Sequence, residues 1–185
     1  MASFDAVSAE CVVFTYKEGL LSAIAHDLKI RVTKFVIDVD EATRAIRAHF
    51  DAASLRVICA MDDGNEAPGT LTAANKREIE SNIVRDVLHA GAYPDIRFGS
   101  TAVEEKGGSY LVKGKLALHG HERQVRARVQ QDGTHYVADV RLHQPDFGIR
   151  PYTALFGTLK VQADVLVRIV VPTQVPSSAG TAAKS

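Results

Sequence analysis

The chain has 185 residues, of which 46% are hydrophobic and 24% are charged. These values are typical of one globular domain, with or without a tail, and they exclude widespread disorder. Lys and Arg together number 22, and so do Asp and Glu. This balance argues against a nucleic-acid-binding protein and against a polybasic surface for anionic lipids.

The N-terminal residues and the cysteines indicate the compartment. The first ten residues contain no basic segment followed by an apolar one, so we predict no signal peptide. No apolar run is long enough for an integral membrane segment. Cys11 and Cys59 lie far apart in apolar runs, which predicts buried, reduced thiols. Together these features predict a soluble cytoplasmic protein.

The first half of the chain alternates apolar and polar residues with a period of two, which is typical of strands. The alternating runs lie near residues 11–16, 27–39, 44–51 and 54–60. Within the second run the parity switches after Ile30 and Val32, because Phe35 and Ile37 fall on the opposite face. We predict a bulge near Thr33–Lys34, which would bring all four side chains inside and bend the strand.

One segment, from Asn75 to Leu88, has helical spacing of its apolar residues. Asn75 with Glu78 three residues later is typical of a capping box, and Gly91 with Pro94 marks the end. The pattern therefore predicts one amphipathic helix of about four turns. Its polar face is expected to point to solvent and consists of Lys76, Arg77, Glu80 and Arg85.

The second half of the chain predicts hairpins. Residues 96–143 form four alternating runs separated by turn residues, which predicts a four-stranded meander. The turns are Gly107-Gly108, Gly120-His121 and Asp132-Gly133. A last run, 160–169, predicts a closing strand. Residues 172–185 are small, polar and interrupted by proline, so we expect a disordered tail after a folded domain of residues 1–171.

Many short strands, one helix and one core favour an up-and-down antiparallel barrel of about eight strands, with a β-sandwich as the alternative. The chain has no Trp, and many predicted inward positions carry small residues. A narrow barrel of this composition has room for a lengthwise channel, although composition alone does not favour one. The alternative is a dry core in which large and small side chains interdigitate.

Motifs for catalysis or cofactors are absent from the sequence. His119-Gly-His121 offers two imidazoles, but no third ligand follows at metal-site spacing, so we expect no metal site. Asp146-Phe-Gly148 spells the kinase triplet without the other kinase motifs. No nucleophile elbow, Walker loop or dinucleotide fingerprint occurs. We therefore expect no catalytic residues and no cofactor.

Several stretches together resemble the YceI-like, polyisoprenoid-binding family. Residues 88–100 resemble its Tyr-Pro and Ile-x-Phe-x-Ser strand, and residues 110–120 resemble its Gly-x-Leu hairpin. Residues 146–149 match its Asp-Phe-Gly-Ile segment. The shorter matches are Ile24–Leu28, Ser54-Leu55 and Leu159–Val165. The resemblance extends over residues 10–170, although many members are exported and this chain shows no signal peptide.

The resemblance implies an all-β fold: an extended, eight-stranded, antiparallel, lipocalin-like barrel with one amphipathic helix that caps its mouth. It also implies that a long apolar lipid binds inside the barrel without catalysis, for carriage or storage. Isoprenoids, isoprenoid quinones and fatty-acid derivatives are the expected ligand classes. Two alternatives stay open, a structural barrel that acts as a homodimer without a ligand and a small enzyme of lipid chemistry.

The candidate ligand contacts follow from the strand runs, the helix and the resemblance. The cavity wall is expected to include Phe35, Phe50, Ile83, Val87, Leu88, Phe98, Leu116, Leu118, Phe147 and Ile149. Tyr152, Leu155 and Phe156 lie in an irregular stretch and are expected to form a mobile flap. His26, helped by Arg150 or Tyr152, is expected to meet a polar head group. Alternatively, His26 is an interior histidine that bonds a backbone carbonyl.

Overall fold

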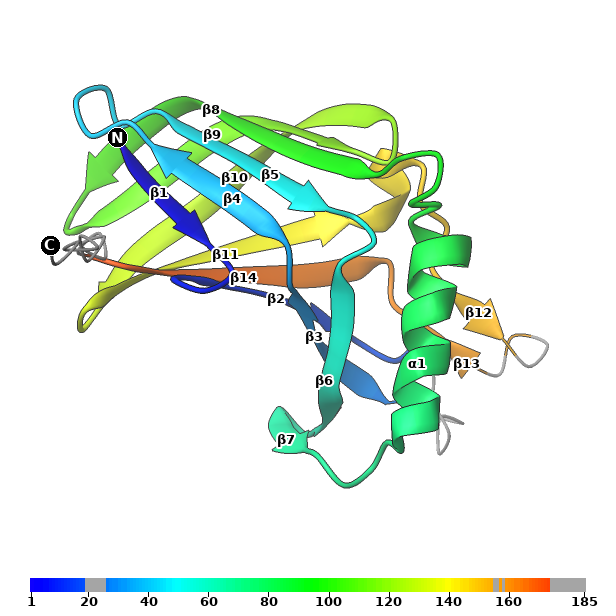
Figure 1. Ribbon diagram of the computed structural model, residues 1–185. Helices are drawn as coiled ribbons and strands as arrows, with labels where there is room; N and C mark the ends of the chain where they lie inside the picture. The colour runs from blue at the N-terminus through cyan, green and yellow to red at the C-terminus, as the bar shows by residue number, and fades with distance from the viewer. Residues whose placement is uncertain (19–25, 155–156, 158, 174–185) are drawn as a thin grey trace, which may run out of the picture.

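The structure is a computed structural model that describes residues 1–18, 26–154, 157 and 159–173 (Figure 1). Its main sheet has twelve antiparallel strands in the order β1-β4-β5-β8-β9-β10-β11-β14-β2-β3-β6-β7. These strands are β1 (Ala2–Asp5), β2 (Glu10–Thr15), β3 (Asp27–Val32), β4 (Phe35–Val39), β5 (Ile46–Asp51), β6 (Leu55–Asp62), β7 (Asn65–Ala67), β8 (Asp95–Lys106), β9 (Ser109–Leu118), β10 (His121–Asp132), β11 (His135–His143) and β14 (Asp164–Pro172). A second sheet pairs β12 (Thr153–Ala154) with β13 (Leu159–Lys160).

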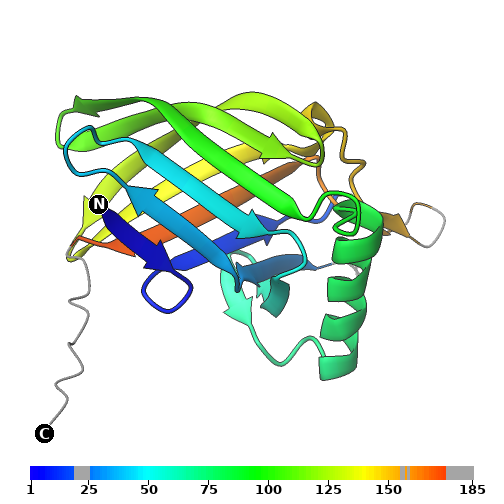
Figure 2. The ribbon, with the colours of Figure 1, turned by 45° about the horizontal axis from the view of Figure 1, so that its top comes forward.

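The predicted number of eight strands is wrong, because the N-terminal segments bend and each bend divides a strand. Only two residues separate β3 from β4, and three separate β5 from β6. After the bend each half pairs with a different neighbour: β3 lies between β2 and β6, whereas β4 lies between β1 and β5. The same chain segments therefore supply both ends of the sheet, which curls back on itself as a half-barrel (Figure 2).

The bend between β3 and β4 falls at Thr33 and Lys34, where a bulge was predicted. The strand is interrupted there and does not form a bulge, and the apolar residues on both sides of the interruption are buried. Ser54, directly before β6, makes the contacts of this corner and is 1% exposed. Its hydroxyl accepts a hydrogen bond from the Lys34 N–H (3.1 Å) and donates one to the Asp51 carbonyl (2.8 Å). The corner thus satisfies the backbone groups that the break removes from the ladder.

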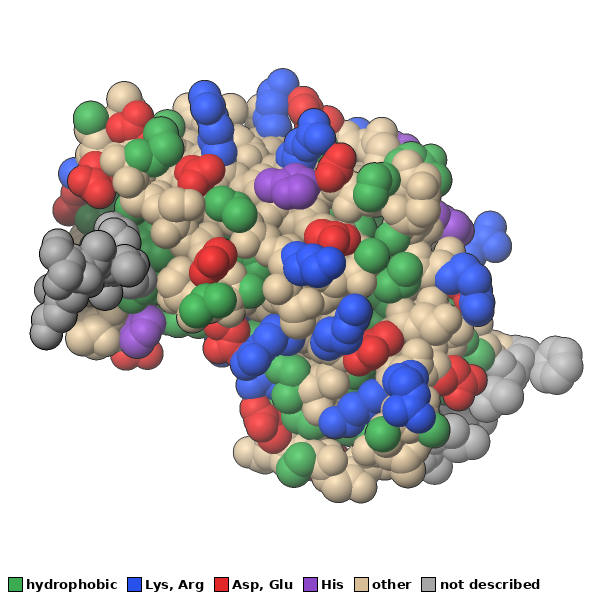
Figure 3. Space-filling model, viewed as in Figure 1, with side chains coloured by type: hydrophobic (Ala, Val, Ile, Leu, Met, Phe, Trp, Pro, Cys, Tyr) green, Lys and Arg blue, Asp and Glu red, His purple; other side chains and the backbone are tan. Residues whose placement is uncertain are grey.

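The meander from β8 to β11 confirms the four predicted strands. The first turn falls at the expected Gly107-Gly108, whereas the other two, His119-Gly120 and Gly133-Thr134, are each displaced by one residue from the prediction. Charged side chains of both signs are interspersed on the face of the molecule seen in Figure 3. Charged side chains pair across or along the strands of the sheet, such as Lys113 with Glu104 (2.6 Å) and Arg97 with Asp95 (3.0 Å). The bond from Lys113 lowers the pKa of the Glu104 carboxyl.

The helix begins earlier than predicted. Helix α1 spans Ala73–Asn82 and continues into one π-helical turn, η1 (Ile83–Val87). Its N-cap is Thr72, whose hydroxyl accepts a hydrogen bond from the Asn75 N–H, while the Asn75 side chain accepts one from the Thr72 N–H (both 3.1 Å). Asn75 therefore closes the capping box from inside the first turn and does not start it.

The prediction of a solvent-facing polar face on the helix is wrong for two residues. Lys76 Nζ donates to the Ile58 carbonyl (2.6 Å), and Glu80 Oε1 accepts from the Val57 N–H (2.8 Å), both on β6. The register of β6 against β3 shifts at this point, so the ladder leaves these backbone groups without strand partners. The helix side chains replace those partners and attach α1 to the end of the sheet, whereas Arg77 and Arg85 are exposed.

The C-terminal strand extends slightly beyond the expected domain boundary. β14 ends at Pro172, and the Thr173 N–H donates to the Thr134 carbonyl (2.9 Å). Residues 174–185 of the predicted tail lie outside the described residues.

Candidate ligand-binding cavity

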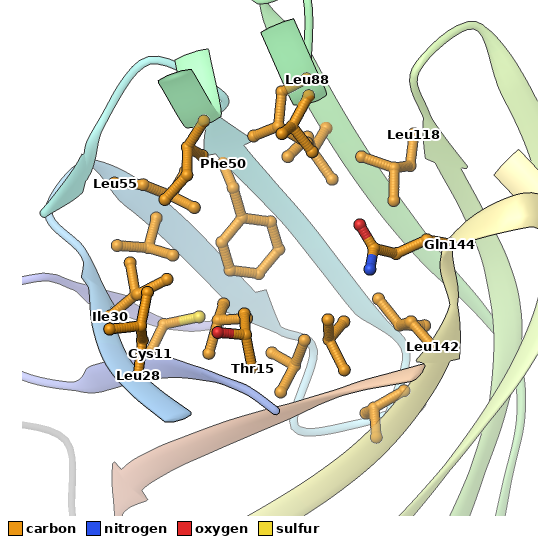
Figure 4. A pocket seen from close by; sticks show the side chains of 18 of the residues that line it. Cys11, Thr15, Leu28, Ile30, Phe50, Leu55, Leu88, Leu118, Leu142 and Gln144 are labelled. Atoms are coloured by element: carbon orange, nitrogen blue, oxygen red, sulfur yellow. The ribbon is translucent and has the colours of Figure 1, made fainter. Parts of the chain in front are cut away.

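A cavity of about 860 Å³ lies between the concave face of the sheet and the helix (Figure 4). Every described strand of the main sheet except β1 and β7 contributes to its wall. The wall is mainly aliphatic and includes Val13, Leu28, Ile30, Ile37, Ala48, Leu55, Ile96, Val112, Val129, Ala138, Leu142, Val165, Val167 and Ile169. The interior is therefore hollow and apolar.

Strand alternation places these side chains. On β10, Val125, Ala127 and Val129 line the cavity, whereas the arginines between them, Arg126 and Arg128, do not. The same period of two holds along β14. The polar residues of both strands thus face outward, as the sequence pattern predicts.

Near the helix, two turns and strand β9 pack together beside the cavity. The π-helical turn closes with a hydrogen bond from the Leu88 N–H to the Ile83 carbonyl (2.8 Å). Both residues line the cavity, and Leu88 packs against the buried Phe147 of η2 (Gln144–Phe147), a short 3-10 turn. Leu116 of β9 completes this cluster.

Hydrogen-bonded histidines connect the end of the helix, the β9–β10 turn and η2 on the outside of the molecule. His89 Nδ1 lies 2.9 Å from His119 Nε2, and His119 Nδ1 lies 3.1 Å from the Phe147 carbonyl. A carbonyl only accepts, so His119 carries its proton on Nδ1 and accepts the bond from His89 at Nε2. His121 Nδ1 also bonds the His119 carbonyl (2.9 Å). Within the described residues, no group of three or more His, Cys, Asp or Glu side chains could hold a metal ion.

Most of the candidate contacts lie in the cavity wall. These are His26, Phe50, Ile83, Val87, Leu88, Phe98, Leu116, Leu118, Phe147, Ile149 and Tyr152. Phe35 does not line the cavity. It is buried, and the centre of its ring lies 5.7 Å from that of Phe50. Arg150 is exposed and also lies outside the lining. Leu155 and Phe156 fall outside the described residues.

The sequence reasoning missed several polar residues of the wall. Gln144 is 8% exposed, its amide projects into the cavity, and its Nε2 donates to the Gln162 carbonyl (3.0 Å) (Figure 4). Asn82 Nδ2 donates to the Tyr152 hydroxyl (3.1 Å) and joins the helix to the segment before β12. Asn82 lies seven residues after Asn75 on one face of α1, and this helical spacing could have identified it. No sequence signal marks Gln144.

Cys11 is a further residue that the sequence did not assign to the wall. It lines the cavity and is 2% exposed. Burial, with a smaller effect from the Glu10 carboxylate, raises the pKa of the Cys11 thiol to about 12. The thiol is therefore neutral and acts as part of the apolar surface.

A small enzyme of lipid chemistry would need a polar cluster inside the barrel, for which the sequence offers His26, Asp27, His119 and Asp146. In the structure these residues make separate contacts. Asp27 Oδ1 accepts a hydrogen bond from the Lys17 N–H (2.7 Å), beside His26 at the start of β3. His119 bonds to Phe147 at the turn between β9 and β10. Asp146 is exposed in η2.

A curled antiparallel sheet around an apolar cavity, with a helix at one end, defines a lipocalin-like protein. Among the helices of the described ranges, none has both the length and the hydropathy needed to cross a membrane. The family model described as the YceI-like domain matches residues 5–172. The chain therefore belongs to the YceI-like family. No curated protein matches it.

Solved structures agree with this fold. BcnA from Burkholderia cenocepacia has a TM-score of 0.63 at 17% identity, covering 90% of this chain and 97% of that one. A polyisoprenoid binding domain from Saccharophagus degradans, implicated in plant cell wall breakdown, has a TM-score of 0.57 at 12% identity, covering 95% and 98%. The YceI protein from Campylobacter jejuni has a TM-score of 0.54 at 16% identity, covering 78% and 82%. At these identities the likeness shows the fold alone.

Proposed function

We propose that this protein binds one elongated apolar lipid inside the cavity and carries or stores it without catalysis. The observation that carries the proposal is the hollow, mainly aliphatic interior of about 860 Å³. Membership of the YceI-like family supports it, as does the fold of a polyisoprenoid binding domain. The ligand class is an isoprenoid, an isoprenoid quinone or a fatty-acid derivative.

The volume sets the size of the ligand. A methylene group fills about the same share of a condensed phase as a water molecule, roughly 30 Å³. The cavity of about 860 Å³ then accommodates on the order of 25 to 30 non-hydrogen atoms, or about five isoprene units. At about 0.3 kcal/mol per atom such a ligand binds with about 8 kcal/mol, a dissociation constant near 1 μM.

Native mass spectrometry of the purified full chain, followed by lipid extraction, tests the proposal. We expect a co-purifying apolar mass that is released when the protein is denatured. The same spectrum reports the number of subunits and so tests the alternative of a homodimer without a ligand. A chain that carries no lipid, and that takes up none of a series of isoprenoid alcohols and fatty acids, would contradict the proposal.

A pair of variants on one strand provides the control. Ala138 of β11 lines the cavity, whereas its neighbour Val137 does not. Ala138→Phe places a ring in the space proposed for the ligand, so we expect it to reduce lipid uptake at least tenfold. Val137→Phe adds a similar ring on the outer face and should leave uptake unchanged. Equal effects of the two substitutions would count against binding inside the cavity.

A further inference from the structure

The lining of the cavity differs between its two ends. Most polar lining side chains come from the end of β2, the start of β3, the helix side and residues 144–160. They are Thr15, Lys17, His26, Thr70, Asn75, Glu78, Asn82, Gln144, Tyr152 and Lys160. The opposite end is formed by residues such as Val39, Ile46 and Val171, with Tyr136 as its polar member. A ligand with an apolar tail and a polar head therefore fits this cavity in one direction.

Lys17 and His26 both line the polar end of the cavity, just beyond the paired residues of β2 and β3. The register of β2 against β3 pairs Val13 with Ile30 and Thr15 with Leu28. From this register, continued by two residues, we infer that Lys17 lies close to His26, and both line the cavity. Directly opposed residues of an antiparallel pair have their Cβ atoms about 5 Å apart. One small anionic group can thus reach both side chains.

Backbone contacts hold Lys17 in this position. Its N–H donates to Asp27 Oδ1 (2.7 Å), and its carbonyl accepts from Gln162 Nε2 (3.0 Å). Lys17 also forms an antiparallel bridge with Val161 on its other side. The backbone of Lys17 is therefore held by hydrogen bonds to β3 on one side and to residues 161–162 on the other.

The charge balance at this end leaves the Lys17 ammonium without a carboxylate partner. Lys160, the other lysine of the lining, is paired with Glu18 (3.1 Å). Lys17 takes part in no ion pair among the described residues, and the remaining residues of the chain contain no Asp or Glu side chain. Glu78, on α1, is the one acidic residue in the described lining. Asp27 lies outside the lining and accepts the Lys17 N–H.

We propose that Lys17 and His26 bind the acidic head group, a phosphate or a carboxylate, of the lipid whose tail fills the cavity. This inference rests on the proposed function. The ammonium and one imidazole N–H donate to the same anion at the rim of an apolar cavity, where charge-assisted hydrogen bonds are stronger than in bulk water. Lys17 takes the place that the sequence reasoning gave to Arg150, which lies outside the lining.

Calorimetry with three ligands that share one tail tests the inference. Geranylgeranyl phosphate, geranylgeranoic acid and geranylgeraniol differ only in the head group. We expect the full chain to bind at least one of the two acidic lipids about tenfold more tightly than the alcohol at low salt, the lower end of what a charge-assisted hydrogen bond contributes. Lys17→Met should remove this preference and leave alcohol binding within twofold. Lys17→Arg should restore most of it, and His26→Gln should reduce it in part.

Lys29→Met is the matched control, because Lys29 lies on β3 outside the lining and pairs with Glu66. We expect it to keep the preference. Equal affinity of wild type for all three ligands would overturn the head-group site and leave the proposed function intact. If none of the three binds, the proposed function itself fails. Inorganic phosphate that binds alone as tightly as the phosphorylated lipid would also overturn the inference, since the site would then recognise free phosphate.

Discussion

A single glycine leaves room for an aromatic ring of the cavity wall. Gly114 of β9 is buried beneath the ring of Phe98, which lies along the wall from the neighbouring strand β8. A Cβ at position 114 would overlap this ring and lie 2.5 Å from the Gly99 carbonyl oxygen. The absence of a side chain at this position lets Phe98 lie flat against the sheet.

We therefore expect Gly114→Ala to push Phe98 towards the cavity. The overlap should destabilise the protein by about 1–3 kcal/mol and weaken geranylgeraniol binding several-fold. Urea unfolding and calorimetry measure the two effects. Gly99→Ala is the control, because an added Cβ there meets nothing within 4 Å. A Gly114→Ala protein with unchanged stability and affinity would show that Phe98 has room to move elsewhere.

The thiol of Cys11 gives a second prediction at this scale. With a pKa of about 12, about one molecule in ten thousand carries a thiolate at pH 8. In a Cys59→Ala background, Cys11 should react with a disulfide reagent at least a hundredfold more slowly than in the urea-unfolded chain. The rate should rise with pH up to the pKa of the thiol and fall when lipid is added. A native rate equal to the unfolded rate would contradict burial in the cavity wall.

Individual residues differ in how far the sequence predicts them. Val87, Leu88 and Phe98 could be assigned to the wall because their apolar side chains follow a helix or strand period. Lys17 could not be assigned, because it lies beyond the end of β2 and its place at the cavity depends on the bridge to Val161. Such pairings join segments far apart in the chain, and local periodicity contains no information about them.

At the scale of elements, the helix depends on contacts at its first turn and on β6. Thr72 and Asn75 satisfy each other's backbone N–H groups. Lys76 and Glu80 bond to the backbone of β6. Asn75 also lines the cavity, so the residue that completes the helix cap is part of the cavity wall.

Thr72→Ala should cost about 1 kcal/mol of unfolding free energy, because it removes the side-chain oxygen that accepts the Asn75 N–H. Thr72→Ser keeps that oxygen and should restore wild-type stability within a few tenths of a kcal/mol. Chemical denaturation of the three proteins measures the difference. Equal stability of the alanine and serine variants would mean that the cap does not contribute to folding.

The sequence predicts elements well where they are regular. The four strands of the meander follow from alternation and from their glycine turns, and their order follows from short connections. The strand count was wrong because a bend is encoded by a few contacts, such as those of Ser54 with Lys34 and Asp51. A parity switch indicates that a bend exists, but it does not reveal that the two halves take different partners.

At the scale of the whole molecule, the hollow interior is the property that sequence patterns described least. Alternation predicts which side chains face inward, but whether they meet across the interior depends on how tightly the sheet curls. The curl here leaves about 860 Å³ between the sheet and the helix. The family resemblance predicted the cavity, whereas composition alone did not exclude a dry core.

The division of the N-terminal strands also determines how the molecule opens. The β3–β4 and β5–β6 segments each have one half near either end of the ladder. Because Ser54 bonds to both Lys34 and Asp51, we expect that freeing this corner releases the two halves together. Amide hydrogens of β4 and β6, although distant in the ladder, should exchange through one common opening with one dependence on denaturant. Separate opening energies for the two strands, measured by native-state exchange, would show instead that the corner works as a hinge.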